Sequence, residues 1–398
     1  MDELYRYQEE ILGNISDRFF RSLYGNLNWN TRFLGITGLR GVGKTTMLLQ
    51  YLKFGATDRK QTLYVTADHP WFYDNTLLEL AQRFSKFGGT HLLIDEIHRY
   101  PSWSRELKNI YDGLPGLQVI FTASSVLDIL QGESDLSRRA LTKELPGLSF
   151  REYLELRYGF IFPSLTLEEL LREPEEPATM VLSRLKPLAA FNDYLVSGYF
   201  PFSLTQPGDS FRQLLNQVIN TVMEVDLQLI EEYSASNTIQ MKKLLGVLAE
   251  SVPFEPNISK IAGRLTMGRD TVKTYLYNLE RARLLNLLRR SVKGVAALQK
   301  PDKIYLENSN LSYALKANPE RGTIRETFFV NQMRNAGHRI GLPKQGDVIV
   351  DERWTFEIGG LSKESRQIRS SEQAYLALDE LEHPYLNRIP LWLFGFLY

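Results

Sequence analysis

Short apolar runs in the N-terminal part of the chain predict the buried strands of an α/β domain. Residues 33–37, FLGIT, form one such run, and residues 92–94 and 119–121 form two more. A glycine-rich segment follows the first run, and residues 46–52, TMLLQYL, then show the apolar spacing of a helix. This succession predicts a strand, a tight loop and a helix.

The middle of the chain, from about 150 to 235, has helical spacing interrupted by prolines. Residues 258–279 then predict a short helix, a turn at 266–268 and a second helix, which is the spacing of a helix-turn-helix. Strand-like runs at 282–290 and 303–310 follow, as expected of a winged helix.

The last part of the chain predicts a second α/β arrangement. Residues 321–333 have an apolar helical face, and residues 346–350 and 354–360 are strand-like. The final stretch, IPLWLFGFLY at 389–398, is too short to span a bilayer. We interpret it as a buried final strand.

The chain length of 398 residues exceeds what one ordinary core supports, which favours several domains. We expect a first domain at 1–150, a helical linker or lid region at 151–235, a winged-helix-like module at 236–310 and a C-terminal α/β domain at 311–398. Hydrophobic residues at 43% and charged residues at 24% are typical of a folded soluble protein.

Charge and cysteine content narrow the classes of function. Forty-seven basic residues balance 47 acidic ones, so any basic surface has to be local. The absence of cysteine excludes disulfides, thiolate metal sites and a cysteine nucleophile. The polar, acidic N-terminal residues do not resemble a signal peptide, so we expect a cytoplasmic protein with no membrane partner.

The glycine-rich segment after the first run has the pattern G-x-x-x-x-G-K-[ST]. Its glycines allow successive backbone N–H groups to point at a polyphosphate, and the following helix N-terminus adds partial positive charge. Lys44 is expected to reach the β- and γ-phosphates, and Thr45 to place its hydroxyl on Mg²⁺. The expected nucleotide-binding residues are Gly38, Leu39, Arg40, Gly41, Val42, Gly43, Lys44, Thr45 and Thr46.

Two acidic residues, Asp95 and Glu96, directly follow the apolar run at 92–94. Ligands of open α/β sheets collect at the carboxyl ends of strands, where these two side chains are expected. Asp95 would hold Mg²⁺ through its water shell, and Glu96 would polarise the attacking water.

Hydroxyl side chains end the third apolar run, where Thr122 is followed by Ser124 and Ser125. The Thr122 hydroxyl is a candidate to orient the water or to touch the γ-phosphate. The alternative is that these residues only cap the strand and open a helix at 126–130.

A pair of arginines, Arg138 and Arg139, follows this segment. Either is a candidate cation for the γ-phosphate, from the same chain or from a neighbouring subunit of a homo-oligomer. The alternative is a solvated or ion-paired surface position.

The order of these motifs resembles a large group of bacterial and archaeal P-loop ATPases of the AAA+ superfamily, whose C-terminal half is a domain of unknown function. The motifs that carry the resemblance are GLRGVGKT, LLIDE, VIFTASS and SRRAL followed by LPGLSFREYL. The likeness is greatest to versions from Bacteroides-type bacteria. It implies a parallel sheet in which the strand of Thr122 lies between the phosphate-loop strand and the Asp95 strand, and it implies ATP rather than GTP.

A local basic excess marks residues 258–300, which contain ten basic and two acidic residues, a balance of +8. Arg269 and Lys273 on the second predicted helix are candidates for DNA contact. The alternative is that this module docks an unknown protein partner.

Three acidic residues of the last domain, Glu326, Asp347 and Glu357, follow the order helix, strand, strand. This is the order of the metal-binding acids in the restriction-endonuclease-like fold, which also has a lysine two residues after the last acid. Position 359 is Gly, and the nearest lysine is Lys363. We therefore expect a degenerate nuclease-like domain. The alternatives are an active nuclease, and an ordinary ion pair or cap for Glu326.

Together these patterns predict an α/β P-loop NTPase that binds ATP and Mg²⁺ and whose hydrolysis drives or gates movement of the winged-helix and C-terminal domains. The alternatives are a slow ATP-gated DNA-binding regulator and an ATP-controlled nuclease.

Overall fold

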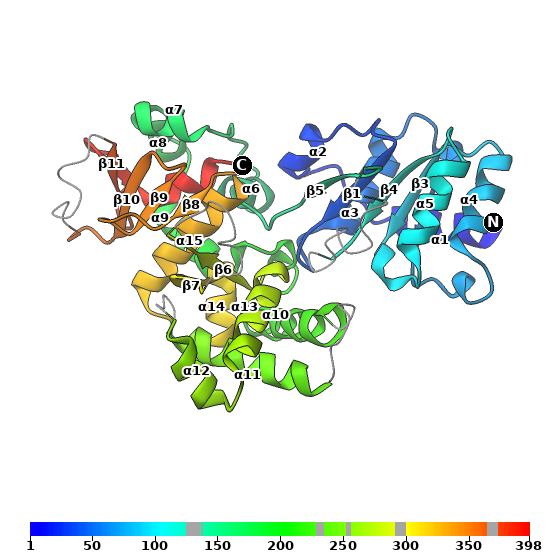
Figure 1. Ribbon diagram of the computed structural model, residues 1–398. Coiled ribbons are helices and arrows are strands. Elements are labelled where there is room, and N and C mark those ends of the chain that lie inside the picture. Colours follow the sequence, from blue (N-terminus) through cyan, green and yellow to red (C-terminus); the bar gives the residue numbers. More distant parts are fainter. Residues whose placement is uncertain (125–135, 137, 228–234, 252–255, 291–299, 364–372) are drawn as a thin grey trace. The chain divides into compact units, whose positions relative to one another are not determined.

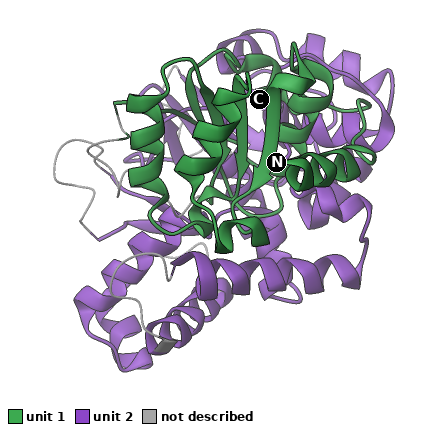
Figure 2. Cartoon of the chain, turned by 90° about the vertical axis from the view of Figure 1, so that its right-hand side faces the viewer, with its two compact units in different colours: residues 1–146 green, residues 147–398 purple. Residues whose placement is uncertain are grey.

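The computed structural model describes residues 1–124, 136, 138–227, 235–251, 256–290, 300–363 and 373–398. The chain divides into two compact units, Met1–Pro146 and Gly147–Tyr398, which are shown in green and purple in Figure 2. The modules expected after residue 150 lie in the second unit, and their separate boundaries stay predictions. In the described part of the chain, no helix combines the length and apolarity needed to cross a membrane.

The strands of the first unit form a parallel sheet in the order β2-β3-β4-β1-β5 (Figure 1). The strand that ends at Thr122 thus lies between the phosphate-loop strand and the strand that ends at Asp95, which confirms the order that the resemblance implies. The strands are β1 (Phe33–Thr37), β2 (Thr62–Thr66), β3 (His91–Asp95), β4 (Gln118–Thr122) and β5 (Leu141–Glu144). The helices are α1 (Asp2–Leu12), α2 (Ser22–Asn26), α3 (Lys44–Gln50), α4 (Leu77–Lys86) and α5 (Trp103–Gly113).

The central strands of this sheet are apolar on both faces, as expected of a parallel sheet covered by helices. Leu92 and Phe121 belong to one buried cluster with Leu80 of α4 and Ile110 of α5. Alternate strand residues such as Leu93 point to the other face, and α3 contacts β3 and β4. The sheet therefore holds the loop after β1 rigidly at its carboxyl edge.

The second unit begins with helices, as the pattern at 150–235 predicts. Its helices are α6 (Phe150–Tyr158), α7 (Leu167–Arg172), α8 (Glu175–Leu182), α9 (Pro187–Asp193), α10 (Asp209–Thr221), α11 (Ala235–Ser251), α12 (Ile258–Leu265), α13 (Arg269–Arg281), α14 (Ser309–Leu315) and α15 (Arg321–Asn335). Shorter helical turns are η5 (Tyr194–Gly198), η6 (Pro201–Leu204) and η7 (Val222–Asp226). The helix α14 contacts η5, α10, α11 and α15, so elements of all the predicted modules pack together within this unit.

The predicted helix-turn-helix is present as α12 and α13. Thr266 adopts a left-handed conformation at the end of α12, and Gly268 caps the start of α13. The predicted strands follow as β6 (Leu285–Leu288) and β7 (Lys303–Leu306), which pair antiparallel. Residues 291–299 lie outside the described residues, so the winged-helix interpretation stays a prediction.

The C-terminal strands form a mixed sheet in the order β12-β11-β10-β9-β8, shown in orange and red in Figure 1. The strands are β8 (Ile340–Gly341), β9 (Val348–Val350), β10 (Trp354–Gly359), β11 (Ala374–Leu378) and β12 (Arg388–Pro390). Helix α15 packs on β10 through Phe329 and Phe356, whose ring centroids are 4.9 Å apart. The relationship to a restriction-endonuclease-like fold stays a prediction.

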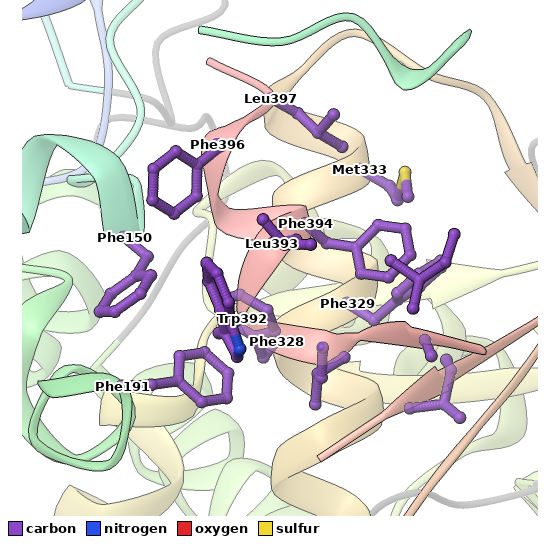
Figure 3. Close-up of a cluster of buried hydrophobic side chains, with 14 of the residues drawn as sticks. Phe150, Phe191, Phe328, Phe329, Met333, Trp392, Leu393, Phe394, Phe396 and Leu397 are labelled. Atoms are coloured by element: carbon purple, nitrogen blue, oxygen red, sulfur yellow. The ribbon is translucent and has the colours of Figure 1, made fainter. Parts of the chain in front are cut away.

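The prediction that 389–398 forms one buried strand is wrong. Strand β12 stops at Pro390, and η11 (Leu391–Phe396) continues as a 3₁₀ helix. Nearly all of its side chains are buried, so the segment lacks the alternation that distinguishes a strand from a buried helical turn. Figure 3 shows Phe396 beside Phe150, with which it forms an edge-to-face pair at 6.0 Å.

Candidate nucleotide-binding site

The phosphate-loop glycines adopt backbone conformations that other residues rarely take. Gly38, Gly41 and Gly43 have φ angles of 148°, 83° and 102°. A Cβ atom on Gly38 would lie 2.4 Å from the backbone oxygen of Leu145, so no larger residue fits there. Gly43 caps the N-terminus of α3, where unpaired backbone N–H groups attract anions. The loop therefore has the backbone of a polyphosphate cradle.

The Lys44 side chain folds back over this loop. Its ammonium donates hydrogen bonds to the backbone oxygens of Gly38 at 2.8 Å and Leu39 at 3.2 Å. The residue is buried, so its charge is concentrated at the loop that the sequence predicts for phosphate binding. An ammonium placed in this way acts as a point charge for phosphate oxygens.

The Asp95 carboxylate accepts hydrogen bonds from hydroxyl groups of α3, β2 and β4. Thr45 Oγ1 donates to Asp95 Oδ2 at 2.8 Å, and the Tyr64 hydroxyl donates to the same oxygen at 3.0 Å. Thr122 Oγ1 donates to the other oxygen, Oδ1. Burial, and next the nearby Asp95 charge, raise the pKa of Tyr64 well above its ordinary value, so its hydroxyl stays a donor.

The side chains of Thr45 and Asp95 fit the divalent cation that the motifs imply. Mg²⁺ prefers hard oxygen ligands and keeps several of its waters, and this hydroxyl and this carboxylate lie in direct contact beside the loop. The sequence-predicted roles of Thr45 as a ligand and of Asp95 as a partner of the water shell are therefore chemically compatible with their placement.

Glu96 occupies a left-handed backbone conformation, with φ 52° and ψ 41°, immediately after β3. Such conformations in residues other than glycine cluster at functional sites. Its Oε2 atom lies 3.2 Å from Arg40 Nη1 and 3.4 Å from His98 Nε2. The carboxylate is thus aimed at the phosphate loop, as its predicted role with the attacking water requires.

Thr122 ends β4 as predicted, but its hydroxyl is engaged between the two acids. It donates to Asp95 and accepts a 2.9 Å hydrogen bond from the Glu96 backbone N–H. A hydroxyl has one hydrogen to donate, so this geometry gives Thr122 the task of positioning Asp95 and Glu96. The backbone N–H of Ser124 lies 3.4 Å from His98 Nδ1. Ser125 and the helix expected at 126–130 lie outside the described residues.

The structure places Arg138 and Arg139 away from the phosphate loop. Leu141 pairs with Leu34 near the start of β1, so these arginines precede β5 at the amino edge of the sheet. Arg139 makes a bidentate ion pair with Asp112 of α5, with both distances at 3.1 Å. Arg138 is exposed. This placement does not support contact with the nucleotide of the same chain.

Sequence reasoning did not identify Arg21 as a residue of this site. Its guanidinium donates to the backbone oxygen of Val42 in the phosphate loop at 2.7 Å and to that of Pro146 at 2.8 Å. The side chain is buried. An isolated arginine before the first strand belongs to no motif, so only the folded arrangement reveals that it braces the loop.

In the part of the chain that the structure describes, five of the ten basic residues of 258–300 form ion pairs with acids, and three of these acids come from outside that stretch. Arg264 pairs with Glu250, Arg283 with Glu307 and Arg290 with Asp302, and these acids lie outside the counted window. On α13, Arg269 and Lys273 are exposed, and Lys273 also contacts Asp270 at 3.0 Å. The +8 balance along the sequence therefore overstates the positive charge on this surface.

Two of the candidate nuclease acids, Glu326 and Asp347, are paired with lysines. Glu326 on α15 pairs with Lys303 at 2.6 Å and accepts from the Tyr305 hydroxyl at 2.7 Å. Asp347 accepts from the Ile358 backbone N–H and from Lys363 Nζ. In the described parts of the chain, no group of three or more histidine or acidic side chains is placed to hold a metal ion.

Lys363, the nearest lysine after Glu357, does reach this region. Its side chain passes over Gly359, where a Cβ atom would lie within 2.8–3.0 Å of Lys363 carbons, and Nζ lies 3.1 Å from Asp347 Oδ2. Glu357 is buried on β10. Lys363, four residues beyond position 359, thus lies over the place where the nuclease motif has its lysine. Glu326, however, is paired with Lys303 and Tyr305.

Comparison with known proteins finds two families similar to parts of the chain. Residues 30–154 match a family described as an AAA domain, and residues 188–321 match a domain of unknown function, DUF8612. An uncharacterized protein of Methanocaldococcus jannaschii, MJ1637, is 27% identical over 295 residues, which cover 71% of this chain and 61% of that protein. The chain thus spans less than two thirds of this relative's length. The likeness to Bacteroides-type proteins stays an expectation.

Similar solved structures include the S. cerevisiae Hsp104-ADP complex and AMPPCP-bound DnaA from Aquifex aeolicus. Both are 16% identical, with TM-scores of 0.31 and 0.28. The first match covers 69% of this chain and 41% of that chain, and the second covers 70% and 88%. Likenesses this low carry no argument about this chain. The match to the AAA domain family contains the phosphate loop, Asp95, Glu96 and Thr122, and it supports a nucleotide-binding ATPase domain at residues 30–154.

Proposed function

We propose that the chain is a Mg²⁺-dependent ATPase. The observation that carries this proposal is the continuous hydrogen-bonded link from Thr45 of the phosphate loop through Asp95 and Thr122 to the Glu96 backbone. Thr45 begins helix α3, and Asp95 and Thr122 end different strands, so the fold brings to one place residues that an ATPase needs together. A glycine loop that served only as a turn would not require this link.

Each residue then has a definite task. The loop N–H groups and Lys44 bind the phosphates, and Thr45 and Asp95 hold Mg²⁺, which neutralises charge that develops on the transferred phosphoryl group. Glu96 accepts the proton of the water that attacks the γ-phosphorus. The preference for ATP over GTP follows the resemblance, and the sequence has no guanine-specific N-K-x-D motif.

Hydrolysis in this proposal gates movement of the second unit. Two contacts support a connection between the loop and the chain segment that precedes that unit. Gly38 packs against the backbone oxygen of Leu145, and Arg21 joins Val42 to Pro146. A change in the loop on phosphate binding or release therefore acts directly on residues 145–146, just before the second unit begins at Gly147.

Glu96→Gln tests the assignment of hydrolysis. The amide keeps the size of the side chain but cannot take a proton, so ATP binding should persist while turnover falls by about 10²- to 10⁴-fold. Binding is followed by isothermal titration and turnover by phosphate release. Unchanged turnover in this variant would contradict the proposed role of Glu96. It would not contradict the proposal that the chain binds ATP.

A DNA-binding regulator is the second candidate function. The exposed face of α13, with Arg269 and Lys273, favours it. If DNA binds there, affinity should fall steeply as salt concentration rises, and Arg269→Ala should lower the affinity. Fluorescence anisotropy with duplex DNA, with and without ATP, measures this. No binding at low salt would remove this candidate without affecting the ATPase.

A further inference from the structure

The amino-edge position of Arg139 raises the question of which cation besides Lys44 meets the γ-phosphate within the chain. Arg40 is the third residue of the phosphate loop, between Leu39 and Gly41. Its guanidinium lies on the carboxyl edge of the sheet, with Nη1 3.2 Å from Glu96 Oε2. The side chain is mostly buried, at 18% exposure. A loop arginine therefore reaches the carboxylate that the proposed reaction uses as its base.

The position of Glu96 fixes where Arg40 lies relative to the substrate. A general base has to lie within hydrogen-bonding reach of the water whose proton it takes, and that water lies beside the γ-phosphorus. A cation in contact with this base is therefore within one side-chain rotation of the γ-phosphate oxygens. Those oxygens carry more negative charge than one carboxylate, and a guanidinium matches phosphate geometry well.

We propose that Arg40 is a γ-phosphate-contacting residue that exchanges partners when ATP binds. In this proposal, which rests on the proposed ATPase function, its guanidinium moves from Glu96 to the γ-phosphate. The exchange frees the Glu96 carboxylate to accept a proton from water. It also places positive charge where negative charge grows during phosphoryl transfer. ADP lacks the γ-phosphate and leaves Arg40 on Glu96, so only ATP activates the base.

His98 keeps Glu96 in place during this exchange. The buried imidazole lies with Nδ1 facing the Ser124 backbone N–H at 3.4 Å and Nε2 facing Glu96 Oε2 at 3.4 Å. Nε2 also lies 3.4 Å from Arg40 Nη2, so the imidazole contacts both members of the ion pair. In the tautomer whose Nδ1 accepts from the backbone, the Nε2–H group donates a hydrogen bond to the carboxylate. Arg99 is more distant, at 4.0 Å from Oε2. Glu96 thus retains a hydrogen-bond donor after Arg40 leaves.

The test compares affinities for ATP and ADP, each with Mg²⁺, in wild type, Arg40→Gln, Arg40→Lys and Glu96→Gln, measured by isothermal titration. Arg40→Gln should weaken ATP binding by about tenfold or more and ADP binding by less than about threefold, because only ATP presents the charged partner. Arg40→Lys should recover part of the loss. Glu96→Gln should tighten ATP binding, because no ion pair has to break.

A matched control removes an arginine ion pair elsewhere in the same unit. Arg59 pairs with Glu9 at 3.0 Å on the surface, so Arg59→Gln should leave both affinities unchanged. Equal losses of ATP and ADP affinity in Arg40→Gln would mean that Arg40 only shapes the loop, and an unchanged ATP affinity would mean a static ion pair. Either result overturns the inference but leaves the ATPase proposal standing. Failure of the wild type to bind either nucleotide would overturn both.

Discussion

The Thr45 hydroxyl donates a 2.8 Å hydrogen bond to the Asp95 carboxylate, which joins residues separated by 50 positions in the sequence. This contact brings the phosphate loop together with the end of β3, although β4 lies between β1 and β3 in the sheet. Thr122 at the end of β4 completes the link by binding both Asp95 and the Glu96 backbone. Strand β4, which lies between β1 and β3, thus positions Asp95 and Glu96 through Thr122.

Thr122→Val should lower turnover while largely preserving ATP affinity. Valine keeps the shape of the side chain but removes a buried donor and acceptor, which costs about 1–3 kcal/mol when partners are left unsatisfied. Asp95 and the Glu96 backbone would lose their common anchor. Steady-state phosphate release measures the effect, with Thr122→Ser as the control that keeps the hydroxyl. Full activity in the valine variant would contradict the positioning role.

Arg139→Ala should leave ATP affinity unchanged in the monomer and cost little stability. The side chains of Arg139 and Asp112 are 22% and 48% exposed. Their ion pair should therefore contribute a coupling free energy of about 0.2–1 kcal/mol to folding. A double-mutant cycle with Asp112→Ala, read by urea unfolding, measures that coupling. A large loss of turnover, accompanied by concentration-dependent activity in wild type, would instead indicate that Arg139 acts on a neighbouring subunit.

Gly38→Ala should impair folding of the phosphate loop. Its φ of 148° disfavours alanine, and the new Cβ would lie 2.4 Å from the backbone oxygen of Leu145. A strained backbone position costs about 1–3 kcal/mol before the clash is counted. Gly263→Ala in α12 is the matched control, because nothing lies within 4 Å of its added Cβ and alanine favours the helix. Thermal unfolding should separate the two variants, and equal stabilities would contradict the strain argument.

The purified chain should not cleave DNA in the presence of Mg²⁺. Glu326 is held by Lys303 and Tyr305, and the described acids form no cluster able to hold a metal ion. Incubation of supercoiled plasmid with the chain and Mg²⁺, analysed on a gel, checks this. Cleavage that disappears in Asp347→Ala would contradict this expectation and indicate a nuclease site at Asp347, whose Oδ2 lies 3.1 Å from Lys363 Nζ.

The sequence predicted the phosphate loop and the neighbourhood of Thr45 and Asp95, because these residues stand at fixed spacings after apolar strands. Their roles toward Mg²⁺ stay predictions. The sequence left open whether Arg139 meets a nucleotide or forms a surface ion pair, because β5, LTKE, is an exposed edge strand without an apolar pattern. Because the sequence does not reveal β5, it does not indicate on which edge of the sheet Arg138 and Arg139 lie. Arg21 and His98 contact the site only in the folded structure, and neither belongs to a sequence motif of fixed spacing.

The C-terminal part was predicted less well for similar reasons. The segment from Leu391 to Phe396 is buried on all sides, so it has no period to separate a strand from a helical turn. Lys363 lies four residues beyond the position that the motif specifies, and only the turn after β10 brings its side chain over Gly359. Linear spacing alone therefore could not place this lysine beside Asp347.

Binding of ATP to wild type and to Lys44→Ala, measured by isothermal titration with Mg²⁺ present, tests the central claim most directly. The Lys44 ammonium lies over the phosphate loop, so its removal should abolish measurable ATP binding. Lys86→Ala, at an exposed position in the last turn of α4, is the matched control and should bind as wild type does. Equal ATP affinity in wild type and Lys44→Ala would contradict the account.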